Sequence, residues 1–173
     1  LATLAWGGHA AMNDGISYYL HLLSDIIHLT AAGAWIGALA AFTLLLCIKK
    51  AEKAVYASQL AAALSGFARA GTIIVLSIVI TAVVNFVFIV EKPLSTLPGS
   101  DYGLLLLIKT VLFFLMLLLA AANRFRLTPR LETALRQGQY KMGIYLMRKS
   151  IITEFTVSVL ILATVAWLGT LSP

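Results

Sequence analysis

The residues best suited to chemistry are two histidines and an aspartate near the start of the first long apolar stretch. His21, Asp25 and His28 stand at positions i, i+4 and i+7. At about 100° of rotation per residue in an α-helix, the three fall on one face. Imidazole nitrogens bind metal ions, and a nearby carboxylate can accept the other ring N–H of a ligating histidine. The spacing therefore favours a metal site. The alternative is a pair of interfacial histidines that bond only to their neighbours.

A complete metal site needs ligands from another segment as well. Two imidazoles two turns apart on a helix are separated by about 10 Å along its axis. The leading segment carries His9 and Met12, and imidazole together with thioether suits copper, especially the cuprous ion, better than zinc, calcium or magnesium. We predict a copper site with four candidate ligands, and with Asp25 as the residue that orients His28. The candidate ligands are His28, His9, His21 and Met12.

Two further polar residues interrupt apolar stretches at a similar depth. Asn85 and Lys109 each lie about five residues inside the outer end of a predicted membrane span. An ionisable side chain in lipid is costly and is a functional candidate by default. We predict that Asn85 and Lys109 support the histidine site in a common pocket. The alternatives are that Lys109 extends to the interface and that Asn85 only joins two helices by a hydrogen bond.

Soft ligands and a carboxyl group lie deeper along the chain. Met116 and Cys47 are spaced so that a cuprous ion could step between them on an inward path, although both types also serve as packing residues. Glu154 lies about one turn inside the last span. An ion pair with an arginine such as Arg124 or Arg148 is one interpretation of Glu154, and a proton relay is the other.

Composition excludes most soluble classes of protein. Of 173 residues, 61% are hydrophobic and 12% are charged, against about half and about a quarter in soluble domains. A soluble enzyme or a disordered chain is therefore not expected. The single cysteine excludes an internal disulfide and a Cys-based zinc site. No phosphate-binding glycine motif or nucleophile elbow is present, so we expect no catalytic role.

Four apolar stretches are each long enough to span a membrane, which takes roughly 20 residues. We predict an all-α transmembrane four-helix bundle over residues 17–173, preceded by an outward-facing leading segment, residues 1–16. The first helix is expected to run for 32 residues from Ser17 to Ile48, and residues 51–68 to form a separate amphipathic helix at the membrane surface. Thr128 and Pro129 predict a helix cap and first turn, and Gly138 the end of that helix. The predicted spans are Ile26–Ile48, Gly71–Val90, Leu104–Asn123 and Ile151–Leu171.

The distribution of positive charge predicts the orientation. Eleven of the thirteen Lys and Arg residues lie in the first and third connections, residues 49–70 and 124–150, and only Lys92 lies in the second. Positively charged connections remain in the cytoplasm. We therefore expect long, basic cytoplasmic connections and place the N-terminal segment, the second connection and the C-terminal end in the periplasm.

Four motifs in order resemble the copper resistance protein D (CopD) family. The first span contains Asp25-Ile-Ile-His28-Leu-Thr-Ala-Ala-Gly-Ala-Trp35-Ile-Gly37, similar to the family's D-x-x-H-L-x-A-A-x-x-W-x-G run. Tyr102-Gly103 with Lys109 resembles its Y-G-x-x-L-x-x-K motif, and Asn123-Arg124 with Pro129 its N-R-x-x-L-x-P motif. Glu154 and Leu168-Gly169-Thr170 resemble its last helix.

The resemblance implies a multi-pass protein of the bacterial inner membrane that helps to move copper from periplasm to cytoplasm. Expected partners are membrane lipid, a periplasmic copper carrier of the CopC type, and either a missing N-terminal half or further copies of the chain. In this interpretation residues 1–6 are the end of a missing helix. The alternative function is a haem-b-binding membrane oxidoreductase, because the His28–Trp35 run also loosely resembles the protoporphyrinogen oxidase family.

Overall fold

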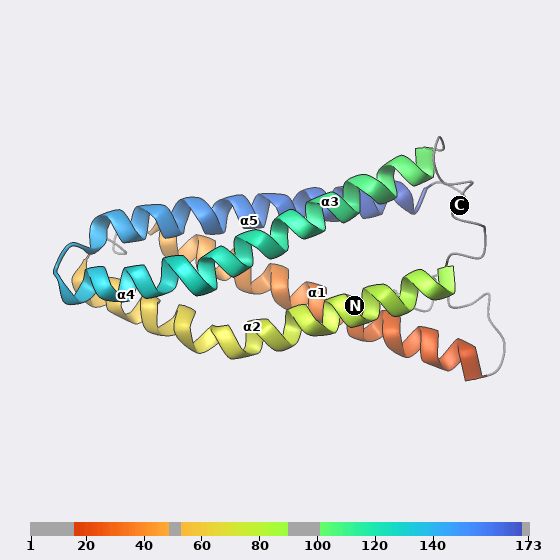
Figure 1. Ribbon diagram of the computed structural model, residues 1–173, viewed down its shortest axis with the longest axis horizontal. Helices are drawn as coiled ribbons and strands as arrows, with labels where there is room; N and C mark the ends of the chain where they lie inside the picture. Colours follow the sequence, from red (N-terminus) through yellow and green to blue (C-terminus); the bar gives the residue numbers. More distant parts are fainter. Residues whose placement is uncertain (1–15, 49–52, 90–100, 171–173) are drawn as a thin grey trace. The chain divides into compact units, whose positions relative to one another are not determined.

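The computed structural model describes residues 16–48, 53–89 and 101–170. Within these ranges the chain is helical apart from short turns and bends, and it contains no strand. Four helices are long and apolar enough to cross a membrane, which confirms the predicted all-α fold class with four spans. Figure 1 shows these helices in chain order.

The first helix, α1, runs over Ile16–Cys47 and has 32 residues. Its length agrees with the prediction and its ends differ from it by one residue. At about 1.5 Å per residue such a helix is roughly 48 Å long, whereas the hydrocarbon core of a bilayer is about 30 Å thick. The first turns of α1, which carry His21, therefore extend beyond what the hydrocarbon requires.

The second helix, α2, is continuous over Ala54–Ile89 and has 36 residues. The separate surface helix predicted for residues 51–68 is therefore wrong. Between the predicted surface helix and the second span lie Arg69, Ala70 and Gly71, and of these only Gly71 disfavours a helix. A single glycine costs an exposed helix roughly 1 kcal/mol, which is too little to end a helix that continues strongly on both sides.

The third span, α3, covers Asp101–Ala122 and continues through a π-helical turn, η5, Asn123–Leu127, into α4, Thr128–Arg136. Pro129 accounts for the wide turn, because it has no N–H to offer to the carbonyl of Phe125 and its ring crowds that carbonyl. The predicted cap at Thr128 is wrong. Its hydroxyl and its backbone N–H both donate to the carbonyl of Asn123, and this closes the π-turn.

The last helix, α5, covers Tyr140–Leu168. Gly138 ends the preceding helix as predicted, with a φ of 71° that favours glycine. The helix begins well before Ile151, the predicted start of the last membrane span. The basic residues between Gly138 and Ile151 are compatible with a helix, although they are too polar to belong to the apolar span.

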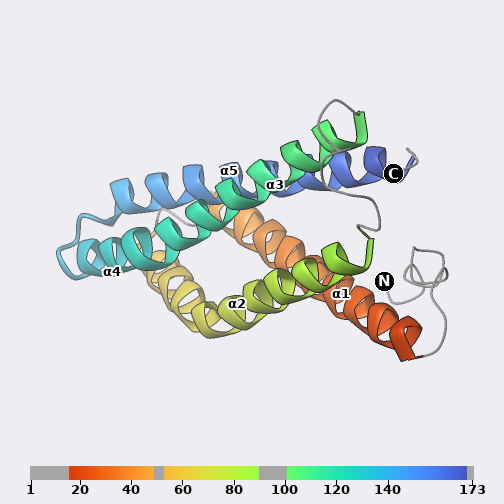
Figure 2. The same cartoon turned by 45° about the vertical axis from the view of Figure 1, so that its right-hand side comes forward.

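The described helices belong to two compact units. The first unit contains residues 1–37 and 69–96, and the second contains residues 38–68 and 97–173. In the first, hydrogen bonds join α1 to α2. In the second, α3 and α5 lie side by side, as Figures 1 and 2 both show, and α4 and η5 also contact α5.

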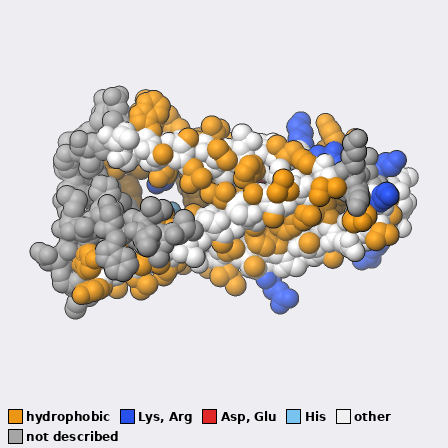
Figure 3. Space-filling model, turned by 180° about the vertical axis from the view of Figure 1, so that it is seen from behind, with side chains coloured by type: hydrophobic (Ala, Val, Ile, Leu, Met, Phe, Trp, Pro, Cys, Tyr) orange, Lys and Arg blue, Asp and Glu red, His pale blue; other side chains and the backbone are white. Residues whose placement is uncertain are grey.

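The surface of the helices is apolar. Large hydrophobic side chains are exposed along all four long helices, and Figure 3 shows them along the visible face, with most of the visible Lys and Arg gathered at the end formed by α4 and the start of α5. Exposed apolar surface on this scale is what a lipid environment requires and water opposes.

Candidate functional site

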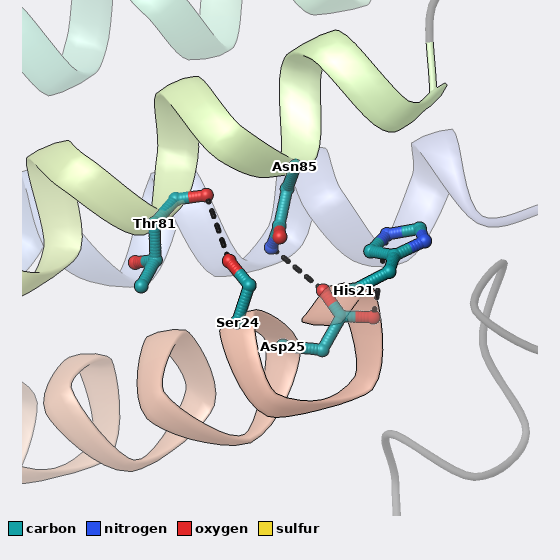
Figure 4. A network of polar contacts seen from close by, with 5 residues as sticks. All are labelled: His21, Ser24, Asp25, Thr81 and Asn85. Carbon is teal, nitrogen blue, oxygen red and sulfur yellow. Dashed lines mark hydrogen bonds and ion pairs between the residues drawn. The ribbon is translucent and has the colours of Figure 1, made fainter. Parts of the chain in front are cut away.

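Six polar residues of the first unit are connected by hydrogen bonds between α1 and α2 and by an ion pair within α1. We call this set the α1–α2 network, and Figure 4 shows five of its members, all except His28. Each member on α1 lies three or four residues from another member, as do the two on α2, so each set occupies one helix face. The network consists of His21, Ser24, Asp25, His28, Thr81 and Asn85.

The shortest contact in the network joins Asp25 to Asn85. The Asn85 amide Nδ2 donates to Asp25 Oδ1 at 2.6 Å. The other amide atom, Asn85 Oδ1, is shielded from solvent and has no hydrogen-bond partner among the residues that the structure describes. The carboxylate is thus held against α2, and an acceptor oxygen beside it has capacity for a further donor or cation.

His21 is the histidine that approaches Asp25. Its Nε2 lies 3.8 Å from Asp25 Oδ2, and the His21 side chain is 1% exposed against 20% for Asp25. Because Asn85 draws Asp25 toward α2, the residue one turn earlier on the same face is buried with it.

His28 contacts a different residue of α2. Its Nδ1 lies 2.9 Å from the hydroxyl oxygen of Thr81. That hydroxyl also lies 2.6 Å from the carbonyl of Ser77, to which it donates. With the hydroxyl proton directed at Ser77, the Thr81 oxygen accepts from His28, so Nδ1 carries the ring proton and Nε2 carries the lone pair that would ligate a metal.

The predicted pairing of Asp25 with His28 is therefore wrong. Both oxygens of Asp25 have other contacts, with Asn85 and with His21, and the hydroxyl of Thr81 takes the place predicted for the carboxylate. The physical reason is that α2 presents its own polar groups at each level of α1. An acceptor on the neighbouring helix competes directly with one on the same helix.

Ser24 and Thr81 are members of the network that the sequence analysis did not single out. The Ser24 hydroxyl donates to the carbonyl of Thr81 over a longer distance, 3.5 Å, and both side chains are buried. The sequence contained one cue that Thr81 belongs to the network, namely its position four residues before Asn85 on the same helix face. Serine and threonine are common in apolar helices, so this signal is weak without the register of α1 against α2.

The other predicted site residues have separate places. His9 and Met12 lie outside the described residues. Lys109 is half-buried on α3 in the second unit, so its predicted pocket with His28 and Asn85 stays a prediction. Residues 16–48, 53–89 and 101–170 contain no group of three or more His, Cys, Asp and Glu that could hold a metal ion.

The proposed inward path also stays a prediction. Met116 is buried and its sulfur accepts a hydrogen bond of 3.4 Å from Ser158. Cys47 is a free, exposed cysteine at the end of α1. Each side chain thus has a local explanation, as a packing residue in the first case and as a surface residue in the second.

The ion pair considered for Glu154 is not formed. Glu154 Oε2 instead accepts a hydrogen bond of 2.5 Å from Asn123 Nδ2. The neighbouring guanidinium groups are engaged with backbone oxygens: Arg124 donates to the carbonyl of Ala68 and Arg148 to that of Leu46. An arginine near a helix end can bond to a nearby carbonyl and stay partly hydrated. Burying its guanidinium group beside Glu154 would instead remove its hydration, which is unfavourable in free energy.

Comparisons with known proteins agree on one family. Residues 61–168 match the family described as copper resistance protein D. The chain is 48% identical to copper resistance protein D of Pseudomonas syringae pv. tomato over 173 residues, which is all of this chain and 56% of that protein. It is 31% identical to the inner membrane protein YebZ of Escherichia coli (strain K12), covering 98% of this chain and 55% of that protein. No solved structure matches the chain.

The four apolar helices and the polar network between two of them define a multi-pass helical protein of the inner membrane. The chain belongs to the copper resistance protein D family. It spans about half the length of the curated relatives that it matches. Nothing in these comparisons supports the alternative of a haem-binding oxidoreductase.

Proposed function

We propose that the chain binds a copper ion at the α1–α2 network and helps to pass it from the periplasm toward the cytoplasm, as a carrier and not as an enzyme. The observation that carries the proposal is the position of the Asp25 carboxylate. It lies between His21 of its own helix and Asn85 of α2. A carboxylate held in this way gives the end of an apolar helix pair a defined site for positive charge.

The chemistry of the network suits a cation. Asp25 is the one carboxylate among its members, and its negative charge is costly near lipid without a positive partner. Asn85 Oδ1 adds an acceptor that no described residue occupies. The histidines add nitrogen ligands, and imidazole suits copper. We propose that His9 and Met12 complete the ligand set, because two or three donors on α1 do not enclose an ion.

The direction of transfer rests on the charge bias between connections. Basic residues cluster after α1 and between α3 and α5, which favours a cytoplasmic location for those parts of the chain. The start of α1 and the end of α2 would then face the periplasm. The network would meet copper from that side, delivered by a carrier of the CopC type. Transport by the whole protein would require the remainder of a long family member or further copies of this chain.

The test is a competition titration of cuprous ion against a chelator, on purified protein and single variants. His28→Ala, His21→Ala and Asp25→Asn should each weaken binding. Ser77→Ala serves as the matched control, because its exposed hydroxyl bonds only to the carbonyl of Ile73 on its own helix. Affinities equal to the parent's in all three network variants would disprove the site. A Soret band in the purified protein would instead support the haem alternative.

A further inference from the structure

A second buried polar pair lies in the other unit and has no part in the proposed copper site. Glu154 on α5 and Asn123 at the start of η5 are 1% and 8% exposed. They are joined by the hydrogen bond of 2.5 Å from Asn123 Nδ2 to Glu154 Oε2. Ser158, one turn further along α5, is 2% exposed, and its hydroxyl is shared between the carbonyl of Glu154 and the sulfur of Met116, so it does not reach the carboxyl group in place of Asn123.

Each member of the pair has one oxygen left over. Glu154 Oε1 and Asn123 Oδ1 are shielded from solvent, and neither has a hydrogen-bond partner within the described part of the chain. Buried polar atoms are nearly always hydrogen-bonded, so two adjacent exceptions require an explanation. Both atoms are acceptors when the carboxyl group is ionised. They cannot bond to each other unless a proton is added.

We propose that Glu154 is a proton-binding site. The proton binds to a lone pair of Glu154 Oε1 and converts the carboxylate into a carboxylic acid, with no other bond formed or broken. The new O–H donates to Asn123 Oδ1 while Asn123 Nδ2 continues to donate to Oε2. Both oxygens that lack partners are then used in one reciprocal acid–amide pair, and the buried side chain carries no charge.

No charged group of the described residues neutralises the Glu154 carboxylate, so a proton is the remaining candidate for doing so. Among residues 16–48, 53–89 and 101–170, none forms an ion pair with Glu154, and Arg124 and Arg148 donate to backbone carbonyls. An ionised Glu154 would be a buried charge with one neutral donor, which is unfavourable in lipid. Besides Glu154, the ionisable residues on α5 and on the elements packed against it are Asp101, Tyr102, Lys109, Arg124, Arg126, Arg130, Glu132, Arg136, Tyr140, Lys141, Tyr145, Arg148 and Lys149.

The π-turn holds Asn123 in place for this pair. The backbone carbonyl of Asn123 accepts both the hydroxyl and the backbone N–H of Thr128. π-turns inside helices occur frequently at functional sites. A fixed amide opposite a carboxyl group that gains and loses a proton would allow the second unit to couple its packing to proton binding, independently of copper.

The experiment is infrared spectroscopy of the purified protein without copper at neutral pH. The parent should show the carbonyl stretching band of a protonated carboxylic acid, and the band should shift in heavy water. Glu154→Gln should remove this band and should preserve the fold, because glutamine can form the same reciprocal pair with Asn123. The matched control is Glu132→Gln on α4, whose carboxylate accepts a hydrogen bond from Ser65 on the exposed surface and should contribute nothing to the band.

A second variant keeps the test decisive if Glu154→Gln fails to fold. Asn123→Ala should leave the acid band in place but move it to higher frequency, because the acceptor of its hydrogen bond is lost. The proposal is overturned if the parent shows no acid band, or if the band persists in Glu154→Gln. It is also overturned if sodium, potassium or cuprous ion removes the band at neutral pH, since the pair would then be a metal-cation site. Apart from the arm with added cuprous ion, the measurement is made without copper. Failure of the copper proposal would therefore not change this result.

Discussion

The amide of Asn85 donates to the carboxylate of Asp25 at 2.6 Å, and this bond fixes which histidine the carboxylate meets. With Oδ1 held by α2, Oδ2 lies 3.8 Å from His21, one turn earlier on α1. His28 is left to the hydroxyl of Thr81. The two histidines are thus oriented by different residues, and the network can be tested one link at a time.

Replacing Asn85 by leucine should lower the free energy of unfolding. The change leaves the half-buried carboxylate of Asp25 without its donor, which typically costs about 1–3 kcal/mol. Unfolding in mixed detergent micelles, followed by helical circular dichroism, measures the effect. Ser77→Ala is the control and should change little. A leucine variant as stable as the parent would mean that the Asn85–Asp25 bond does not stabilise the helix pair.

Replacing Thr81 by valine should weaken copper binding while keeping the packing. Valine preserves the branched shape and removes the acceptor that holds the Nδ1–H of His28. Loss of such a partner typically reduces metal affinity by about 10–100-fold. Copper titration measures the affinity, and nitrogen NMR of the histidine ring reports the tautomer. Thr81→Ser retains the hydroxyl and should retain both properties; an unchanged affinity in the valine variant would separate Thr81 from the site.

Replacing Asp25 by asparagine should weaken copper binding more than it weakens the fold. The amide oxygen of the new side chain can still accept from Asn85, so the bridge between helices survives. The negative charge that favours a cation is lost. We expect a decrease of about 10–100-fold in affinity if Asp25 supports the ligands. Comparing copper titrations with unfolding curves separates the two effects, and equal losses in both would assign Asp25 a purely structural role.

Labelling of introduced cysteines should establish the orientation in the membrane. In a Cys47→Ser background, a cysteine at position 95 should react with an impermeant reagent from the periplasmic side. One at position 137, in the turn after α4, should not react until the membrane is opened. The expectation follows from the excess of positive charge in the first and third connections. The reverse pattern would place the α1–α2 network at the cytoplasmic face and reverse the proposed direction of copper transfer.

The helical spans were predictable because each apolar run is long and lacks strong helix breakers. Helix ends were harder to predict, as α2 and α5 show, because basic residues beyond a span continue a helix as readily as they end it. The shared face of His21, Asp25 and His28 also follows from spacing alone. Their actual partners depend on the register between two helices, and a shift of one turn would exchange Thr81 and Asn85.

The sequence singled out Glu154 as a buried carboxyl group but did not predict its partner. Charge counting favours an arginine, since several lie near the ends of α3 and α5. Asn123 was visible only as part of the Asn-Arg motif, and nothing in that motif shows that its amide faces the carboxyl group. Such neutral pairs leave no charge pattern in a sequence, so packing alone reveals them.

The π-turn at Asn123–Leu127 also has a consequence for how this chain tolerates insertions and deletions. Asn123 and Leu131, at 8% and 0% exposed, both face inward in the second unit. In an uninterrupted α-helix, residues eight positions apart differ in angular phase by about 80°, and one extra residue in a wide turn reduces this to about 20°. The extra residue therefore keeps the two side chains in phase. Deleting any single residue from the turn would leave the composition of both helices almost intact, yet it would rotate α4 and carry Leu131 off the face it shares with Asn123.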